Sequence, residues 1–188
     1  MQFIHLVEGA YSKESCNHLI DFFETNINLA VPGNAGDKKL NNLEIGIDFK
    51  NTDNSELLKK LYDNVLINML FEYVEKFPLI DSVLGQWTVT STCQFAKFES
   101  NNYYSHIHCE HGKRYPNRIL AWMMYLNDIK DGGGTYFHHQ NFTTNPVAGN
   151  LYIWPAGWTH MHKGVNAPKE IKYTLTGWVD YRTIVEEE

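Results

Sequence analysis

The run QWTVTSTCQFAKF, residues 86–98, decides the fold, because it opens a part of the chain in which β-strand patterns follow one another. It is rich in the β-branched and aromatic residues that favour strands. Four more runs of the same texture follow, most of them separated by Gly or Pro: 118–126, 134–138, 150–154 and 172–181. Several short strands with turn residues between them predict a double-stranded β-helix, or jelly roll.

The residues before this stretch show helical patterns instead. Ser12 can cap a helix whose apolar residues recur at helical spacing, namely Cys16, Leu19, Ile20, Phe22 and Phe23. Asn54 or Ser55 can cap a second, longer helix, which Pro78 closes. We therefore expect helices packed on the outside of the double sheet.

Between the two helices, residues 31–50 are rich in Gly, Asn and Asp. This composition predicts a loop followed by a short strand at 43–49. The expected class is thus α+β, mainly β, with a jelly roll flanked by N-terminal helices.

Composition and charge restrict the class of protein. With 188 residues, 43% of them hydrophobic, the chain has a globular composition, and we expect a single domain (1–188) with a jelly-roll core at about 86–181. The net charge of −6 argues against non-specific nucleic-acid binding. No apolar run has the length of a membrane span, and the first residues lack a signal-peptide pattern. Three irregularly spaced cysteines make a disulfide framework unexpected and favour a reduced, cytoplasmic setting.

Histidines gather in the strand-rich part, with seven of the nine between positions 106 and 162. If residues 104–110 are extended, His106, His108 and Glu110 point to one face. His160 and His162 would share a face in the same way. Two imidazoles and one carboxylate can hold one side of a metal, which suits non-haem Fe(II) with a chelating co-substrate and O₂. His106 in place of the carboxylate and His160 in place of His162 remain alternatives.

Lys172 lies ten residues after His162 and begins the strand-like run KYTLTGW. A lysine inside such an apolar strand is costly to bury unless a carboxylate meets it. Lys172 is therefore predicted to hold the far carboxylate of a co-substrate, the alternative being a lysine at the solvent edge of the strand. The turn at 131–135, Asp-Gly-Gly-Gly-Thr, is either part of this site or a plain hairpin turn.

The ordered set of motifs resembles the prolyl-4-hydroxylase-like branch of the 2-oxoglutarate/Fe(II) dioxygenases. The matching residues, over about 86–181, are Arg118, Tyr125-Leu126-Asn127, Gly132-Gly133-Gly134-Thr135, Pro146, Gly149, His162 and Lys172. The resemblance extends faintly to the segment around Cys16. The chain looks most like the small hydroxylases of bacterial and phage genomes.

The resemblance implies a role for each matching residue. The iron ligands would be His108, Glu110 and His162, and the co-substrates 2-oxoglutarate and O₂, with ascorbate as an accessory reductant. The C5 carboxylate of 2-oxoglutarate would contact Lys172, Tyr125 and Thr174, while Tyr104 matches a family tyrosine only loosely. Arg118 would be a catalytic residue at the substrate mouth, or would pair only with a structural carboxylate.

Two positions depart from the family pattern. Glu110 stands where most relatives have Asp, so an extra methylene must be accommodated; the presence of a carboxylate argues against a halogenase. Phe98 stands where relatives often have a hydrogen-bonding Tyr, so one co-substrate contact is missing or replaced. His111, His138 and His139 are expected in loops or on the substrate face.

The implied reaction is hydroxylation of an aliphatic C–H, with a proline-containing peptide or protein as leading substrate and a free amino acid as the second choice. The pocket wall would include Trp122, Trp154 or Trp158, and specificity would lie in loops 31–39 and 112–117. Two rival interpretations are a cupin-like metal dioxygenase without 2-oxoglutarate, which does not need Lys172, and a non-catalytic jelly-roll binding module.

Overall fold

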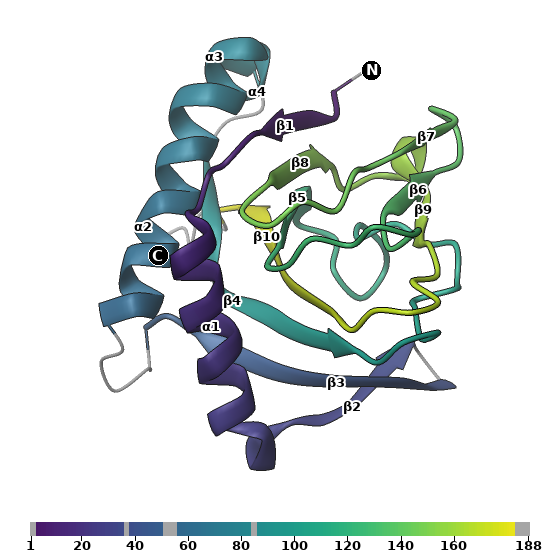
Figure 1. Cartoon of the computed structure of the whole chain (residues 1–188). Helices are drawn as coiled ribbons and strands as arrows, with labels where there is room; N and C mark the ends of the chain where they lie inside the picture. Colours follow the sequence, from purple (N-terminus) through teal and green to yellow (C-terminus); the bar gives the residue numbers. More distant parts are fainter. Residues whose placement is uncertain (1–2, 36–37, 51–55, 84–85, 183–188) are drawn as a thin grey trace.

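The computed structural model describes residues 3–35, 38–50, 56–83 and 86–182, and within them two antiparallel sheets face each other (Figure 1). The larger sheet has seven strands in the order β1-β8-β5-β10-β4-β3-β2, and the smaller has three in the order β7-β6-β9. The strands are β1 (His5–Val7), β2 (Val31–Ala35), β3 (Lys38–Asp48), β4 (Trp87–Phe98), β5 (Arg118–Tyr125), β6 (Thr135–Phe137), β7 (Phe142–Thr143), β8 (Leu151–Pro155), β9 (His162–Gly164) and β10 (Lys172–Tyr181). The predicted jelly-roll fold is confirmed.

Strand β10 organises the larger sheet, because it pairs with β4 on one side and with β5 on the other. Thr174 lies opposite Ala96 of β4 and Tyr125 of β5. Alternate residues of a strand face the same side. The side chains of β10 that reach the inner face, toward the smaller sheet, are Lys172, Thr174, Thr176 and Trp178.

The helices cover the outer face of the larger sheet, away from β6, β7 and β9 (Figure 1). Helix α1 (Lys13–Thr25) begins as expected, with the Ser12 hydroxyl accepting a hydrogen bond from the Ser15 amide at 3.1 Å. Helix α2 (Glu56–Asn68) packs beside it. The shared core includes Leu19, Phe23, Leu58, Leu61 and Phe95, each of which contributes about 2 kcal/mol by leaving water.

The second helix is less regular than its sequence pattern predicts. After α2 the chain forms a π-turn (η2, Met69–Tyr73), a short α3 (Val74–Lys76) and α4 (Leu79–Val83). The extra residue in the π-turn rotates the following side chains. Tyr73 is buried there, and its hydroxyl donates to the Phe3 carbonyl at 3.1 Å. The predicted caps at 54 and 55 lie outside the described residues.

The prediction of a loop at 31–42 is wrong. Residues 31–35 form β2 and residues 38–42 the first half of β3, and β3 pairs along the edge of β4 from Asn42 to Asp48. Pairing with β4 satisfies the backbone and overrides the turn-like composition. Two 3₁₀-helices complete the structure, η1 (Ile27–Leu29) and η3 (Trp158–His160).

None of the helices in the described part of the chain is long and apolar enough to cross a membrane.

Candidate metal centre

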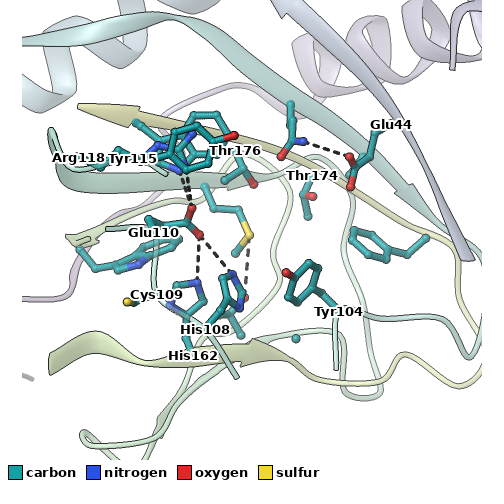
Figure 2. A pocket seen from close by; sticks show the side chains of 18 of the residues that line it. Glu44, Tyr104, His108, Cys109, Glu110, Tyr115, Arg118, His162, Thr174 and Thr176 are labelled. Atoms are coloured by element: carbon teal, nitrogen blue, oxygen red, sulfur yellow. Dashed lines mark hydrogen bonds and ion pairs between the residues drawn. The ribbon is translucent and has the colours of Figure 1, made fainter. Parts of the chain in front are cut away.

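The three predicted metal ligands come together between the two sheets. Nε2 of His108 lies 3.3 Å from Oε1 of Glu110, and Nε2 of His162 lies 3.5 Å from the same oxygen. One potential ligand atom from each residue lies within 4.8 Å of the other two. This is the group of two imidazoles and one carboxylate that the sequence predicts, and Figure 2 shows it at one end of a pocket.

Backbone pairing brings the two distant segments together. The amide of His108 donates to the His162 carbonyl at 3.0 Å, and the amide of His162 donates back at 2.8 Å. The amide of Glu110 donates to the Ala156 carbonyl at 3.0 Å, which ties the segment to the loop after β8. The ligands are therefore placed by main-chain hydrogen bonds.

Both imidazoles present the same nitrogen to the centre. Nδ1 of His108 bonds to the His106 carbonyl at 3.0 Å, and Nδ1 of His162 bonds to the His160 carbonyl at 2.8 Å. A carbonyl only accepts, so each Nδ1 carries the proton and each neutral ring has its lone pair on Nε2. The donor set consequently fits Fe(II), with two neutral imidazoles and one carboxylate directed at one point.

The second oxygen of Glu110 is held from the opposite side. Its Oε2 accepts a 2.7 Å hydrogen bond from the indole nitrogen of Trp178 and a 3.2 Å bond from Arg118. Burial by itself would raise the pKa of Glu110, but His108 and His162, which in their protonated form donate hydrogen bonds and place positive charge beside it, hold this pKa well below its ordinary value. The hydrogen bonds from Trp178 and Arg118 hold the Glu110 carboxylate in place. A Glu side chain, one methylene longer than Asp, is thereby fixed in position at the metal centre.

Arg118 lines the cavity and contacts Glu110, and its role at the substrate mouth stays a prediction. Its guanidinium lies 3.7 Å from the ring centroids of both Tyr115 and Trp178, and it pairs with Glu110. Stacked between two rings and bonded to a carboxylate, the guanidinium is immobilised. It positions a metal ligand, and this contact gives no support to a direct catalytic role.

A buried ammonium group lies in the same cavity. Lys172 is 4% exposed, its Nζ donates to the Gly133 carbonyl at 3.1 Å, and it lies 4.7 Å from the centroid of the Phe98 ring. Among the described side chains no carboxylate forms an ion pair with it. Burial lowers the pKa of Lys172 from 10.5 to about 8. The alternative of a lysine at a solvent edge is wrong, and Phe98, at the position where relatives often have a tyrosine, makes a cation–π contact with Lys172 instead of offering a hydroxyl.

The glycine turn has a structural reason to accompany this lysine. Gly132 and Gly133 both have positive φ, at 74° and 71°. A side chain at Gly132 would collide with the Asn166 carbonyl, and one at Gly133 would collide with Ile129. The turn thus needs glycine at both positions in order to present the Gly133 carbonyl to Lys172.

The cavity between the sheets has a volume of about 410 Å³, enough for a small co-substrate and part of a second molecule. Lys172 and the metal cluster both line it, together with Thr174 and Tyr104. The ring of Tyr104 lies 4.4 Å from that of His108, centroid to centroid. Burial raises the pKa of Tyr104, and the charge of Glu110 raises it further. The predicted contacts Thr174 and Tyr104 are therefore placed where a bound molecule can reach them.

Tyr125 is placed differently from the prediction. It is fully buried, does not line the cavity, and its hydroxyl bonds to the hydroxyls of Thr135 at 3.1 Å and Thr144 at 2.6 Å. Thr135 lines the cavity in its stead. The expected direct bond from Tyr125 to 2-oxoglutarate has no support in this arrangement, and Tyr125 orients Thr135.

The alternative histidine ligands are excluded by the backbone. Residues 104–110 are not a continuous strand, and only His108 makes an isolated bridge, so the expected alternation fails and His106 does not line the cavity. His160 ends the 3₁₀-helix η3 and also lies outside the cavity lining. His111, His138 and His139 do not line it either.

Of the three tryptophans named as wall candidates, only Trp154 lines the cavity. Trp122 is buried in the outer core, and Trp158 is 71% exposed. Sequence reasoning missed Trp178, although the two-residue period from Lys172 through Thr174 and Thr176 places it on the same face. It also missed Glu44, which lines the cavity from β3.

Comparisons with known proteins agree with this geometry. Residues 93–180 match the family described as the 2OG-Fe(II) oxygenase superfamily. No curated protein matches the chain in sequence. The fold is similar to that of a viral collagen prolyl hydroxylase from Paramecium bursaria Chlorella virus-1 in a 2OG complex, with a TM-score of 0.72, 16% identity, and coverage of 96% of this chain and 97% of that chain.

Two further solved structures are similar. A Pseudomonas putida prolyl-4-hydroxylase has a TM-score of 0.71 at 17% identity, with 96% of this chain and 93% of that chain covered. A prolyl hydroxylase from Trichoplax adhaerens, in complex with a hypoxia inducible factor peptide fragment, has a TM-score of 0.73 at 15% identity, with 96% and 84% covered. Residues 93–180 therefore resemble a 2OG-Fe(II) oxygenase domain, and the chain has the fold of prolyl hydroxylases, with a His-Glu-His cluster and a buried lysine that fit Fe(II) and 2-oxoglutarate.

Proposed function

We propose that this oxygenase hydroxylates an aliphatic C–H bond, with proline in a peptide or protein as its leading substrate. The observation that carries the co-substrate part of the proposal is the buried ammonium of Lys172, which has no carboxylate partner among the described side chains and shares a cavity with the metal cluster. A buried lysine without a counter-charge is unfavourable until a carboxylate arrives. A cupin-like enzyme without 2-oxoglutarate has no use for such a group.

Each residue of the cavity then has a defined task. His108 and His162 would hold the metal through Nε2, and Glu110 would hold it through Oε1. Lys172 would bind the far carboxylate of 2-oxoglutarate, with Thr174 beside it. Trp178 and Arg118 keep the Glu110 carboxylate turned toward the metal position. Bound Fe(II) would activate O₂, which is the oxidant for the C–H bond, and 2-oxoglutarate would supply the other two electrons on its conversion to succinate and CO₂.

The prolyl substrate is supported by the three solved structures described above, each of which is named as a prolyl hydroxylase. One of them holds a peptide, which favours a peptide over a free amino acid as the partner of this chain. The carboxylate of Glu110 occupies the third ligand position, which supports hydroxylation rather than halogenation.

Mass spectrometry of a library of proline-containing peptides tests the proposal. We expect a gain of one oxygen atom that requires Fe(II), O₂ and 2-oxoglutarate together, with one succinate formed per oxidised peptide. His162→Ala should abolish the gain, and Trp158→Phe, at an exposed position outside the cavity, should preserve it. Oxidation of a free amino acid alone would keep the enzyme class and reject the peptide substrate. Metal-dependent oxidation without 2-oxoglutarate would favour the cupin-like class.

We further propose that the protein works in a reducing, cytoplasmic environment. The described cysteines Cys16, Cys93 and Cys109 are all free thiols, which supports this location. Fractionation of cells that produce the protein, followed by detection with an antibody, tests it.

A further inference from the structure

A second carboxylate lines the cavity at some distance from the metal cluster. Glu44 lies on β3 opposite Ala96 of β4, and Ala96 lies in turn opposite Thr174 of β10. These three residues form one row across the inner face of the larger sheet. Figure 2 shows Glu44 across the pocket from Glu110, with Thr174 and Tyr104 between them in that view.

Neutral groups hold the Glu44 carboxylate in place. The amide nitrogen of Asn42 donates to Oε1 at 2.7 Å, and that of Gln94 donates to Oε2 at 3.0 Å. Among the side chains that the structure describes, which do not include those of residues 34–41, no lysine, arginine or histidine forms an ion pair with Glu44. A carboxylate can accept about four hydrogen bonds, so both oxygens retain acceptor capacity toward the cavity.

The other charged groups of the cavity already have partners or tasks. Arg118 is bonded to Glu110. Lys172 is assigned to the far carboxylate of 2-oxoglutarate, and it lies in the neighbouring row of paired residues, with Phe98 and Asn42, and not in the row of Glu44. Arg114 lies near Tyr115, beside Arg118. Glu44 is therefore a negative charge in the cavity, across from the metal cluster, that no described group neutralises.

Burying a carboxylate without a counter-charge is unfavourable, and burial indeed raises the pKa of Glu44. The amides of Asn42 and Gln94 orient the Glu44 carboxylate although its burial is unfavourable. A neutral substrate would not need this charge, because an Asn or Gln at position 44 would accept a hydrogen bond equally well. We propose that Glu44 binds a protonated amino group of the primary substrate. This inference rests on the proposed function: in a prolyl substrate, the cation is either the imino group of an N-terminal proline or the side chain of a lysine beside the proline.

Matched peptides separate these two sources. One pair contains lysine or Nε-acetyl-lysine next to the proline, and the other begins with free or N-acetylated proline. In one of the two pairs we expect acetylation to lower kcat/KM by about 10- to 100-fold, as for loss of one partner of a buried charge pair. In Glu44→Gln the same acetylation should change kcat/KM by less than about threefold. Glu99→Gln, which alters a carboxylate outside the cavity lining, should retain the full effect.

Binding provides a readout that does not depend on turnover or on the variant. With Mn(II) and 2-oxoglutarate loaded, the cationic member of the recognised pair should raise the melting temperature of the wild-type protein more than its acetylated partner does. Equal responses to both members of both pairs, in turnover and in melting temperature, overturn the proposal. So does an acetylation effect of the same size in Glu44→Gln.

The two proposals fail in different ways. Oxidation of prolyl peptides that ignores acetylation would keep the proposed function and reject the role of Glu44. Charge-dependent binding at Glu44 without any prolyl oxidation would reject the prolyl substrate and keep the subsite for a cationic group.

Discussion

Replacing Lys172 by methionine should stabilise the protein while removing its response to 2-oxoglutarate. Burial lowers the pKa of the Lys172 ammonium from 10.5 to about 8, so near neutral pH the folded state keeps a charge that its surroundings disfavour. That difference in pKa corresponds to about 3 kcal/mol. Methionine has a similar shape without the charge, so this cost disappears.

Part of the gain is offset. The variant loses the hydrogen bond from Nζ to the Gly133 carbonyl, which is worth about 1 kcal/mol, and the cation–π contact with Phe98. We therefore expect the free energy of unfolding of the ligand-free protein to rise by about 2 kcal/mol in Lys172→Met. Addition of 2-oxoglutarate should raise the stability of the wild type and leave that of the variant unchanged.

The protein is first stripped of metal and co-substrate. Urea unfolding with and without added 2-oxoglutarate then measures the free energy of unfolding and its response to 2-oxoglutarate. Lys163→Met is the matched control, because Lys163 lies on β9 outside the cavity lining and its loss should leave the response to 2-oxoglutarate intact. A ligand-free Lys172→Met protein less stable than the wild type would refute the reasoning. It would mean that the buried ammonium contributes net stability without a carboxylate.

Three further outcomes are expected. Trp178→Phe removes the donor to Oε2 of Glu110 and should weaken Fe(II) binding about 10-fold by calorimetry, whereas Trp158→Phe should leave it unchanged. Equal Fe(II) affinities of the wild type and Trp178→Phe would mean that the 2.7 Å hydrogen bond does not position Glu110. Binding of 2-oxoglutarate should weaken as pH rises above about 8, because Lys172 is charged below its pKa and neutral above it; binding that strengthens with pH would contradict this sign. Gly177→Ala should lower the free energy of unfolding by about 1–3 kcal/mol, because its Cβ would collide with the buried Trp122 ring, while Gly46→Ala, another strand position with open space around it, should change it by much less.

The strand pattern of the chain was predictable because it is local. Each strand can be recognised from its own strand-forming residues and the turn residues beside it. The observed strands lie within a residue or two of the predicted ranges for β4, β5, β6, β8 and β10. The strand predicted at 43–49 coincides with the second half of β3, whereas β2 and the first half of β3 were missed, because the pairing of β3 with β4 is a long-range contact that composition does not reveal. Glu44 lies within the predicted strand at 43–49, but without its pairing partner β4 the sequence does not show that its side chain faces the cavity.

The site was predicted to the level of its residue types and less well in its geometry. His108, Glu110, His162 and Lys172 do meet in one cavity, although the roles assigned to them remain predictions. Their selection over the neighbouring histidines depended on spacing relative to Lys172, whereas the structure excludes His106 and His160 through an irregular backbone and a 3₁₀-helix. Tertiary contacts set such departures from extended structure, and the alternation of side chains along a strand does not predict them.

The most direct test of the central claim is the visible absorption of the protein mixed with Fe(II) and 2-oxoglutarate without oxygen. Chelation of Fe(II) by the keto acid produces a charge-transfer band that neither component gives alone. We predict this band for the wild type, its loss in His162→Ala, and its loss in Lys172→Met at the same concentration of 2-oxoglutarate. A wild-type protein without the band, or a His162→Ala protein that keeps it in full, would contradict the assignment of this cavity as the site of Fe(II) and 2-oxoglutarate.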